Sequence, residues 1–236
     1  IMDCAILHRP DSDKTLKLLK DTVIATNKKW SKLLGIPQST ATTCVKPSGT
    51  VSQLTDSASG IHARHAPYYV RTVRGDVKDS LTQFLMNQNI PNEPDFNSPS
   101  NTVVFSFPFK SPDAAICRTD IKALEQLHTW KRFSDHWCEH KPSVTVSVKE
   151  HEWIEVGNWC YKNFDSLSGI SFLPFSDHSY RQAPYQDSTK KDYNKLCAAM
   201  PKSINWKEFD NYEKEDNTKA SQELACSAGV CEIVDI

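Results

Sequence analysis

Short β-prone runs alternate with longer stretches of helical periodicity between residues 12 and 175 of this chain. The first helical stretch, residues 12–34, ends before Gly35 and repeats apolar side chains at helical spacing: Leu16, Leu19, Val23, Trp30 and Leu34. Strands that alternate with helices build an α/β sheet or an α/β barrel. The alternation therefore predicts an α/β fold and an amphipathic first helix.

The remaining elements follow from the same periodicities. Strands are predicted at residues 42–45, 68–73, 102–107, 144–148 and 170–175. Helices are predicted to begin near residue 50 and to cover the regions around residues 77–85, 119–139 and 153–159. After about residue 176, prolines and a highly charged stretch at residues 211–219 leave little that could build a core. We expect an ordered wrap over residues 176–215 and a flexible tail over residues 216–236.

Charge and composition exclude several classes of partner. The chain has 28 basic and 29 acidic residues, so no net field favours nucleic acid or an anionic membrane surface. Its apolar runs are strand-sized and its first residues lack the pattern of a signal peptide, which predicts a cytoplasmic protein. Because the sequence starts at Ile1 and becomes helical almost at once, we expect it to be cut from a longer chain.

A loop between a predicted strand and a predicted helix is the first candidate binding site. Residues 46–52 place small and hydroxyl-bearing residues where backbone N–H groups can face an anion. The candidate phosphate contacts are Ser48, Gly49, Thr50, Val51 and Ser52, and the hydroxyls of Ser48, Thr50 and Ser52 are possible donors. The loop lacks the two-glycine pattern of a nucleoside-triphosphatase P-loop, and Ser and Thr also cap ordinary helices.

Cationic side chains gather just beyond this loop. His62, Arg64 and His65 precede a predicted strand that carries Arg71 and Arg74. They are able to contact an anionic ligand, but the alternative is that they are surface groups paired with nearby acids. A zinc site here is disfavoured because no cysteine lies at ligand spacing from the histidines.

Cys226 and Cys231, near the carboxyl end, form the second candidate site. Four residues including Gly229 separate them, so their sulfurs can meet with little strain. A dithiol on a solvated tail is suited to thiol–disulfide exchange, whereas two zinc ligands, or two incidental thiols, are the alternatives. The remaining cysteines are scattered singly and are predicted to be buried thiols: Cys4, Cys44, Cys117, Cys138, Cys160 and Cys197.

Several segments together resemble the adenosylcobalamin-dependent, class II ribonucleotide reductases, closest to the monomeric ribonucleoside-triphosphate reductases. The matching segments are residues 43–52, 59–74, 142–146 and 168–174 and the terminal cysteine pair, with further support from residues 182–185 and 212–218. The resemblance covers nearly the whole chain from about residue 40.

The resemblance implies a ten-stranded α/β barrel, of which residues 1–175 supply the C-terminal part, residues 176–215 the wrap and residues 216–236 a redox-active tail. It implies that residues 48–52 bind substrate phosphates. It also implies that Cys226 and Cys231 re-reduce an active-site disulfide and are recharged by thioredoxin or a similar reductant. The implied cofactor is adenosylcobalamin, and a deoxynucleotide effector is expected for the complete protein.

One departure from the family pattern limits what this chain does alone. The family's radical cysteine lies in an Asn-x-Cys-x-Glu pattern, and no cysteine here has those neighbours. That cysteine and the substrate-reducing pair are expected upstream of Ile1, so the isolated chain is predicted to be inactive. The competing hypotheses are a non-catalytic nucleotide-binding module and a zinc-stabilised interaction domain.

Overall fold

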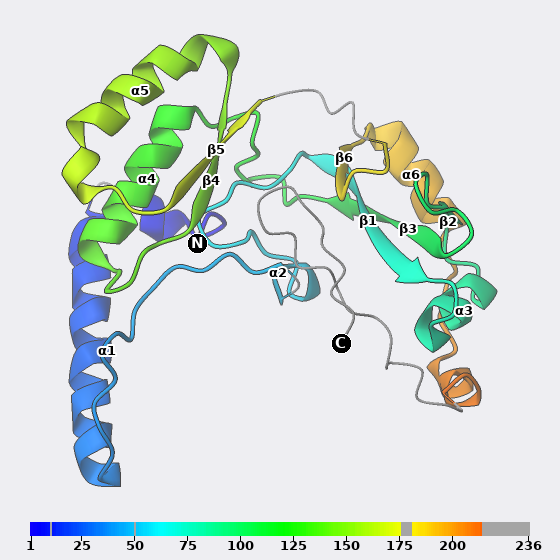
Figure 1. Cartoon of the computed structure of the whole chain (residues 1–236), viewed down its shortest axis with the longest axis horizontal. Helices are drawn as coiled ribbons and strands as arrows, with labels where there is room; N and C mark the ends of the chain where they lie inside the picture. The colour runs from blue at the N-terminus through cyan, green and yellow to red at the C-terminus, as the bar shows by residue number, and fades with distance from the viewer. Residues whose placement is uncertain (10, 50, 176–180, 214–236) are drawn as a thin grey trace. The chain divides into compact units, whose positions relative to one another are not determined.

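The computed structural model describes residues 1–9, 11–49, 51–175 and 181–213, and the chain divides into two compact units (Figure 1). Unit 1 comprises Ile1–Tyr69, Phe109–Ser179 and Asp187–Thr189, and unit 2 comprises Val70–Pro108, Tyr180–Gln186 and Lys190–Ile236. The tail predicted at residues 216–236, with Cys226 and Cys231, lies outside the described residues.

The first predicted helix is confirmed as α1 (Ser12–Leu34), which follows the 3₁₀ turn η1 (Ala5–His8). Gly35 ends α1 in the left-handed region with φ 65°, and its N–H bonds the carbonyls of Ser31 and Lys32. Of the apolar residues that predict the amphipathic face, Leu16 is buried, whereas Trp30 and Leu34 are 49% and 63% exposed. The other described residues therefore cover only the start of the stripe.

The core of unit 1 lies around a parallel strand pair. β4 (Val144–Val148) pairs with β5 (Ile170–Pro174) in a register that sets Val146 opposite Phe172. The connection between them contains the turns η2 (Glu150–Glu152) and η3 (Phe164–Ser166) on either side of α5 (Trp153–Lys162). The valines of β4 alternate inward, as period-two spacing predicts.

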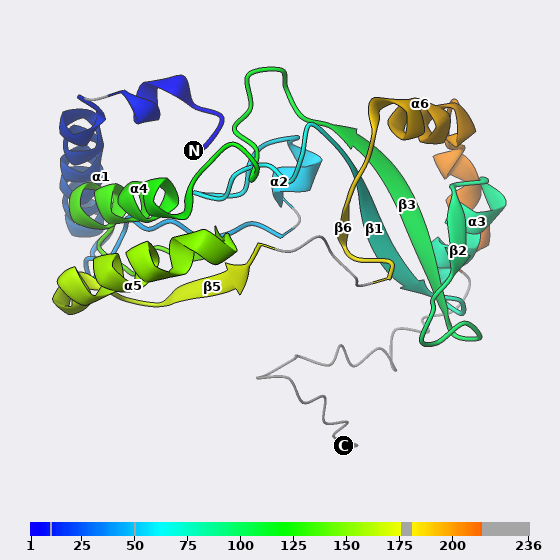
Figure 2. The ribbon, with the colours of Figure 1, turned by 90° about the horizontal axis from the view of Figure 1, so that it is seen from above.

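Helix α4 (Ala123–His136) contacts α1, β4 and α5, and Figure 2 shows α4 and α5 running alongside one another. Trp130 on α4 is fully buried, and its indole N–H donates to the Pro142 carbonyl at 3.0 Å. Burial of the tryptophan thus comes with a partner for its one polar atom.

The strand predicted at residues 42–45 is wrong. The Glu139 N–H bonds the Thr43 carbonyl and the Ser143 N–H bonds the Val45 carbonyl, while a Glu139 carboxylate oxygen accepts from the N–H and hydroxyl groups of Thr42 and Thr43. The segment that follows α4 therefore supplies the partners that a neighbouring strand would otherwise provide.

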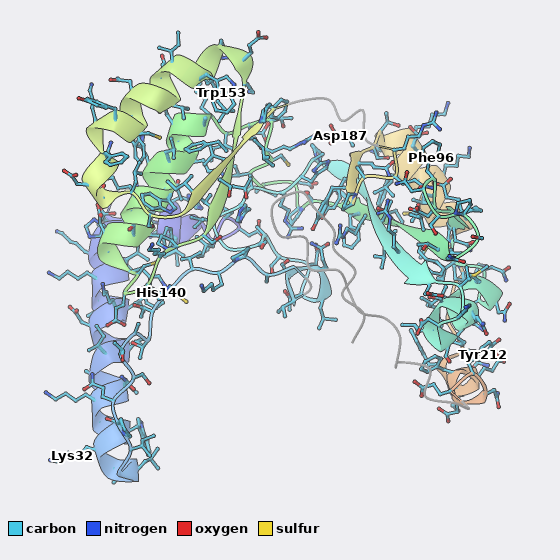
Figure 3. The ribbon with its side chains drawn as sticks, viewed as in Figure 1. Lys32, Phe96, His140, Trp153, Asp187 and Tyr212 are labelled. Atoms are coloured by element: carbon cyan, nitrogen blue, oxygen red, sulfur yellow. The ribbon has the colours of Figure 1, made fainter. Side chains whose placement is uncertain are left out.

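Unit 2 holds most of a four-stranded sheet in the order β2-β3-β1-β6, formed by β2 (Asn92–Pro94), β3 (Thr102–Lys110), β1 (Tyr68–Asp76) and β6 (Tyr185–Asp187). β2 runs antiparallel to β3. Helices α3 (Ser80–Asn87) and α6 (Lys190–Ala199) and the 3₁₀ turn η4 (Trp206–Asn211) complete the unit. Phe84 on α3 is fully buried, with its ring centroid 5.2–5.5 Å from those of Trp206, Phe209 and Tyr212 (Tyr212 is labelled in Figure 3).

The predicted mixture of helices and strands is confirmed, but the strands of the described residues form two separate sheets and no closed barrel. The region predicted to form a wrap, residues 176–215, contains the helix α6, which the sequence did not predict. Among the helices of the described residues, none is long and apolar enough to cross a membrane.

Candidate functional site

The candidate phosphate loop, residues 46–52, leads from buried Val45 into the single turn α2 (Val51–Leu54). Ser48 is held at both of its peptide groups, because its N–H donates to the Ser59 hydroxyl oxygen at 2.8 Å and that hydroxyl donates to the Ser48 carbonyl at 3.1 Å. The hydroxyl of buried Ser52 also donates to the Ser48 carbonyl, at 2.7 Å. Thr50 lies outside the described residues.

Two glycines shape the loop differently. Gly60 has φ +57°, and a Cβ there would lie 3.1 Å from the Lys46 carbonyl oxygen. Only glycine allows this backbone conformation at such a close approach without strain. A Cβ at Gly49 would meet no described atom within 4 Å, so this position borders open space.

Arg64 ties the turn after α2 to the N-terminal segment. Its side chain is only 4% exposed, and its guanidinium lies 2.9 Å from the carboxylate of Asp3 and 2.8 Å from that of Asp56. The same guanidinium donates to the Asp56 carbonyl at 2.5 Å. Asp56 has a positive φ of 46°, unusual for a residue with a side chain. Arg64 thus fixes the residue at which the chain leaves α2.

The electrostatics of this cluster favour its charged form. Burial raises the pKa of Asp3, but hydrogen bonds from Arg64 and from the Ala58 N–H outweigh that effect and leave the pKa below its ordinary value. The Ala58 N–H lies 2.8 Å from the Asp3 carboxylate. Asp3 therefore holds Arg64 and the backbone beyond α2 at once.

His62 joins the loop region to the core of unit 1. Its Nε2 accepts from the Thr145 N–H on β4 at 3.0 Å, and its Nδ1 lies 3.0 Å from the Ser59 carbonyl. Because a backbone N–H always donates, Nε2 carries no proton and Nδ1 is the donor to Ser59. His62 is thus placed as a neutral imidazole.

The other predicted cationic groups also have partners on the protein. His65 Nε2 lies 2.8 Å from the Asp187 carboxylate, which also accepts two bonds from Arg118 at 2.9 and 3.0 Å; Asp187 is labelled in Figure 3. Pairing with acids is confirmed for Arg64 and His65, although Arg64 is buried and not a surface group. The ligand contacts suggested for these side chains stay predictions.

In unit 2 the two arginines of β1 hold the segment that begins at Arg181. Arg74 lies 2.9 Å from the buried carboxylate of Asp95 and donates to the Gln182 carbonyl at 3.1 Å. Burial raises the pKa of Asp95, but the bonds from Arg74 and two backbone N–H groups lower it below its usual range. Arg71 lies over the Tyr185 ring at 4.4 Å. These arginines serve the packing of unit 2.

The prediction of buried single cysteines is only partly confirmed. Cys117 and Cys138 are buried, and burial raises the pKa of the Cys138 thiol to about 11. Cys44 and Cys197 are exposed, contrary to the prediction, and Cys4 and Cys160 lie in between. The described part of the chain holds no group of three or more His, Cys, Asp or Glu side chains able to bind a metal ion.

Comparisons with known proteins point to one family. No family model matches the chain. It is 27% identical over 233 residues to the adenosylcobalamin-dependent ribonucleoside-triphosphate reductase of Lactobacillus helveticus, a match that covers 96% of this chain and 31% of the relative. It is 29% identical over 214 residues to a probable enzyme of the same name from Dictyostelium discoideum, with 88% of this chain and 27% of the relative covered.

The fold also has a match among solved structures. A crystal structure of a B12-dependent, class II ribonucleotide reductase matches with a TM-score of 0.75 at 24% identity, over 88% of this chain and 29% of that one. The predicted resemblance to adenosylcobalamin-dependent ribonucleotide reductases is therefore confirmed. The chain spans about a third of the length of the relatives it matches.

Proposed function

We propose that this chain is part of a ribonucleotide reductase that converts ribonucleoside triphosphates to 2′-deoxyribonucleoside triphosphates by radical chemistry for DNA synthesis. The observation that carries the proposal is the match to adenosylcobalamin-dependent ribonucleoside-triphosphate reductases over 96% of the chain. The complete enzyme works in the cytoplasm and responds to a deoxynucleotide effector.

Adenosylcobalamin, when bound, supplies the radical that starts the reaction. Among the described histidines, His62 and His65 are engaged with protein partners, so we assign neither of them to the cofactor.

The loop from Ser48 to Ser52 binds the substrate phosphates. The Ser59 hydroxyl fixes the backbone of this loop at Ser48, and the lack of a side chain at Gly49 leaves space beside the loop. Backbone N–H groups at such a turn favour an anion by their partial positive charge.

Gly49→Ala tests this role. Its Cβ meets no described protein atom but narrows the approach to the loop, so KM for the triphosphate should rise in the complete reductase while thermal stability stays unchanged. Gly157→Ala in α5, where a Cβ also meets nothing within 4 Å, is the control for KM. An unchanged KM in Gly49→Ala would remove the loop from the substrate site.

Cys226 and Cys231 re-reduce the active-site disulfide. Their two thiols transfer two electrons and two protons to that disulfide, become a disulfide themselves, and are recharged by thioredoxin or a similar reductant. The radical cysteine and the substrate-reducing pair lie outside this chain. The isolated 236 residues should consequently form no deoxynucleotide, and detectable formation would contradict the assignment.

The tail is tested in the complete reductase with both cysteines changed to serine. Turnover supported by thioredoxin should fall to the level of a single cycle, whereas a small dithiol that reaches the active site directly should still support turnover. Cys197→Ser, which removes an exposed thiol outside the pair, is the control. Full thioredoxin-dependent turnover without the pair would favour a module with an incidental tail.

A further inference from the structure

His62 occupies a junction between the candidate phosphate loop and the most deeply buried strand of unit 1. Its ring accepts from the N–H of Thr145, and the residues on either side of Thr145, Val144 and Val146, are 2% and 0% exposed. On its other side the ring donates to the Ser59 carbonyl. The His62 ring is thus fixed on one side by the buried strand β4.

Ser59 passes this constraint to the loop. Its hydroxyl accepts from the Ser48 N–H and donates to the Ser48 carbonyl, so both peptide groups of Ser48 are held by one side chain. A path of hydrogen bonds therefore runs from β4 through His62 and Ser59 to Ser48, the first of the candidate phosphate contacts.

The loop depends on such outside contacts for its position. α2 has only four residues, and a helix that short has no stability of its own in water. Arg64 holds the end of the turn at Asp56, while the path through His62 holds its beginning at Ser48. The two attachments lie on opposite sides of α2 in the sequence.

We propose that His62 is a positioning residue for substrate binding: as a neutral imidazole it fixes Ser59, and through it Ser48, in register with β4. This inference rests on the proposed phosphate-binding role of residues 48–52. His62 does not touch the substrate. Its role is to fix the position of the loop's N–H groups for contact with the substrate phosphates.

Two substitutions separate the two hydrogen bonds of the ring. His62→Asn keeps a donor near the position of Nδ1 for Ser59, and His62→Gln keeps an acceptor near the position of Nε2 for Thr145. In the complete reductase, His62→Ala and His62→Gln should raise KM for the triphosphate about tenfold, the usual effect of one lost hydrogen bond, while kcat changes little. His62→Asn should restore KM to within about threefold of the wild type.

A merely structural histidine would give the opposite pattern. If His62 only completes the hydrogen bonding of β4, His62→Gln restores thermal stability and no variant moves KM apart from kcat, which overturns the inference. Ser59→Ala provides a second test of the same connection. It removes the Ser59 hydroxyl that bonds both peptide groups of Ser48 but keeps the Ser59 carbonyl that His62 bonds. KM of Ser59→Ala should rise as it does in His62→Ala, and KM of the double variant with both substitutions should be no higher than that of either single variant.

Equilibrium binding of the triphosphate, measured without turnover, gives the same comparison if a variant loses activity. A weaker affinity in Gly49→Ala together with wild-type affinity in the His62 and Ser59 variants would refute the positioning role and leave the phosphate loop standing. Wild-type affinity in Gly49→Ala would instead refute the phosphate loop itself.

Discussion

Arg64 offers the sharpest test of how unit 1 holds its candidate site. Replacing it with methionine removes a guanidinium whose side chain is 4% exposed and leaves an apolar chain of similar length. The lost contacts are the bonds to Asp3, to the Asp56 carboxylate and to the Asp56 carbonyl. The substitution also frees Asp56 from the contact that holds its positive φ.

The magnitude follows from the exposure of each partner. Asp3 is 29% exposed on its side chain, so its bond with Arg64 belongs to the charged class worth about 1.5–3 kcal/mol. Asp56 is 63% exposed, so its carboxylate adds only about 0–1 kcal/mol, as at a protein surface. Arg64→Met should therefore lower the free energy of unfolding of unit 1 by about 1.5–4 kcal/mol.

Urea unfolding followed by tryptophan fluorescence measures this loss. Trp206 is the one tryptophan of the sequence assigned to unit 2, so a Trp206→Phe background makes the emission report unit 1. In a double-mutant cycle with Asp3→Asn, the coupling energy should be about 1.5–3 kcal/mol, because removing both partners leaves no buried charge unpaired. Additive single effects within about 0.5 kcal/mol would refute the reasoning.

The pH dependence supplies an independent check. The folded pKa of Asp3 is lowered, so its stabilising contribution is complete above the unfolded pKa, near 3.9, and is lost as the pH falls through the folded pKa. The stability difference between the wild type and Asp3→Asn should be full at pH 7 and should shrink below about pH 4. A difference that stays constant with pH would mean that Asp3 is not the charged partner.

Phe84→Ala should destabilise unit 2 by about 3–5 kcal/mol and shift the Trp206 emission, because Phe84 is fully buried against the rings of η4. The control Met86→Ala, on the exposed side of α3, should cost less than about 1 kcal/mol. Equal losses of stability in the two variants would contradict the assigned packing. Gly60→Ala should lower the free energy of unfolding, measured by thermal unfolding, by about 1–2 kcal/mol, since φ of Gly60 is positive and the new Cβ meets the Lys46 carbonyl. Gly157→Ala in α5 should instead stabilise the protein by about 0.5–1 kcal/mol. An unchanged stability in Gly60→Ala would argue against the close approach of Gly60 to Lys46.

Local signals in the sequence predict the elements that are fixed locally. α1 ends where Gly35 follows an apolar repeat, and β4 shows the alternation that one buried face demands. The strand expected at residues 42–45 failed because its carbonyls bond the segment after α4, roughly a hundred residues away in sequence, which no local pattern reveals. β2 was missed because it is three residues long and contains Pro94.

The candidate site shows the same division. The sequence predicts a tight loop at residues 46–49 and a helix that begins near residue 50, and the structure has the single turn α2 from Val51 onward, because small and hydroxyl residues are turn formers. It did not predict that His62 and Arg64 face inward to hold that loop. Their partners, Thr145 and Asp3, are distant in sequence. The sequence alone does not indicate whether a histidine or arginine side chain contacts a ligand or another part of the protein.

The stacked rings of Tyr69 and Phe109, with centroids 5.3 Å apart and planes 14° apart, stand at the two points where unit 1 is interrupted by residues 70–108. The Ser111 N–H bonds the Pro67 carbonyl just outside them. In terms of topology, residues 70–108 are an insertion whose two ends meet within about one strand spacing. We predict that a short turn can join Tyr69 to Phe109 in place of these residues, which would leave the candidate phosphate loop, His62 and Arg64 in a smaller protein.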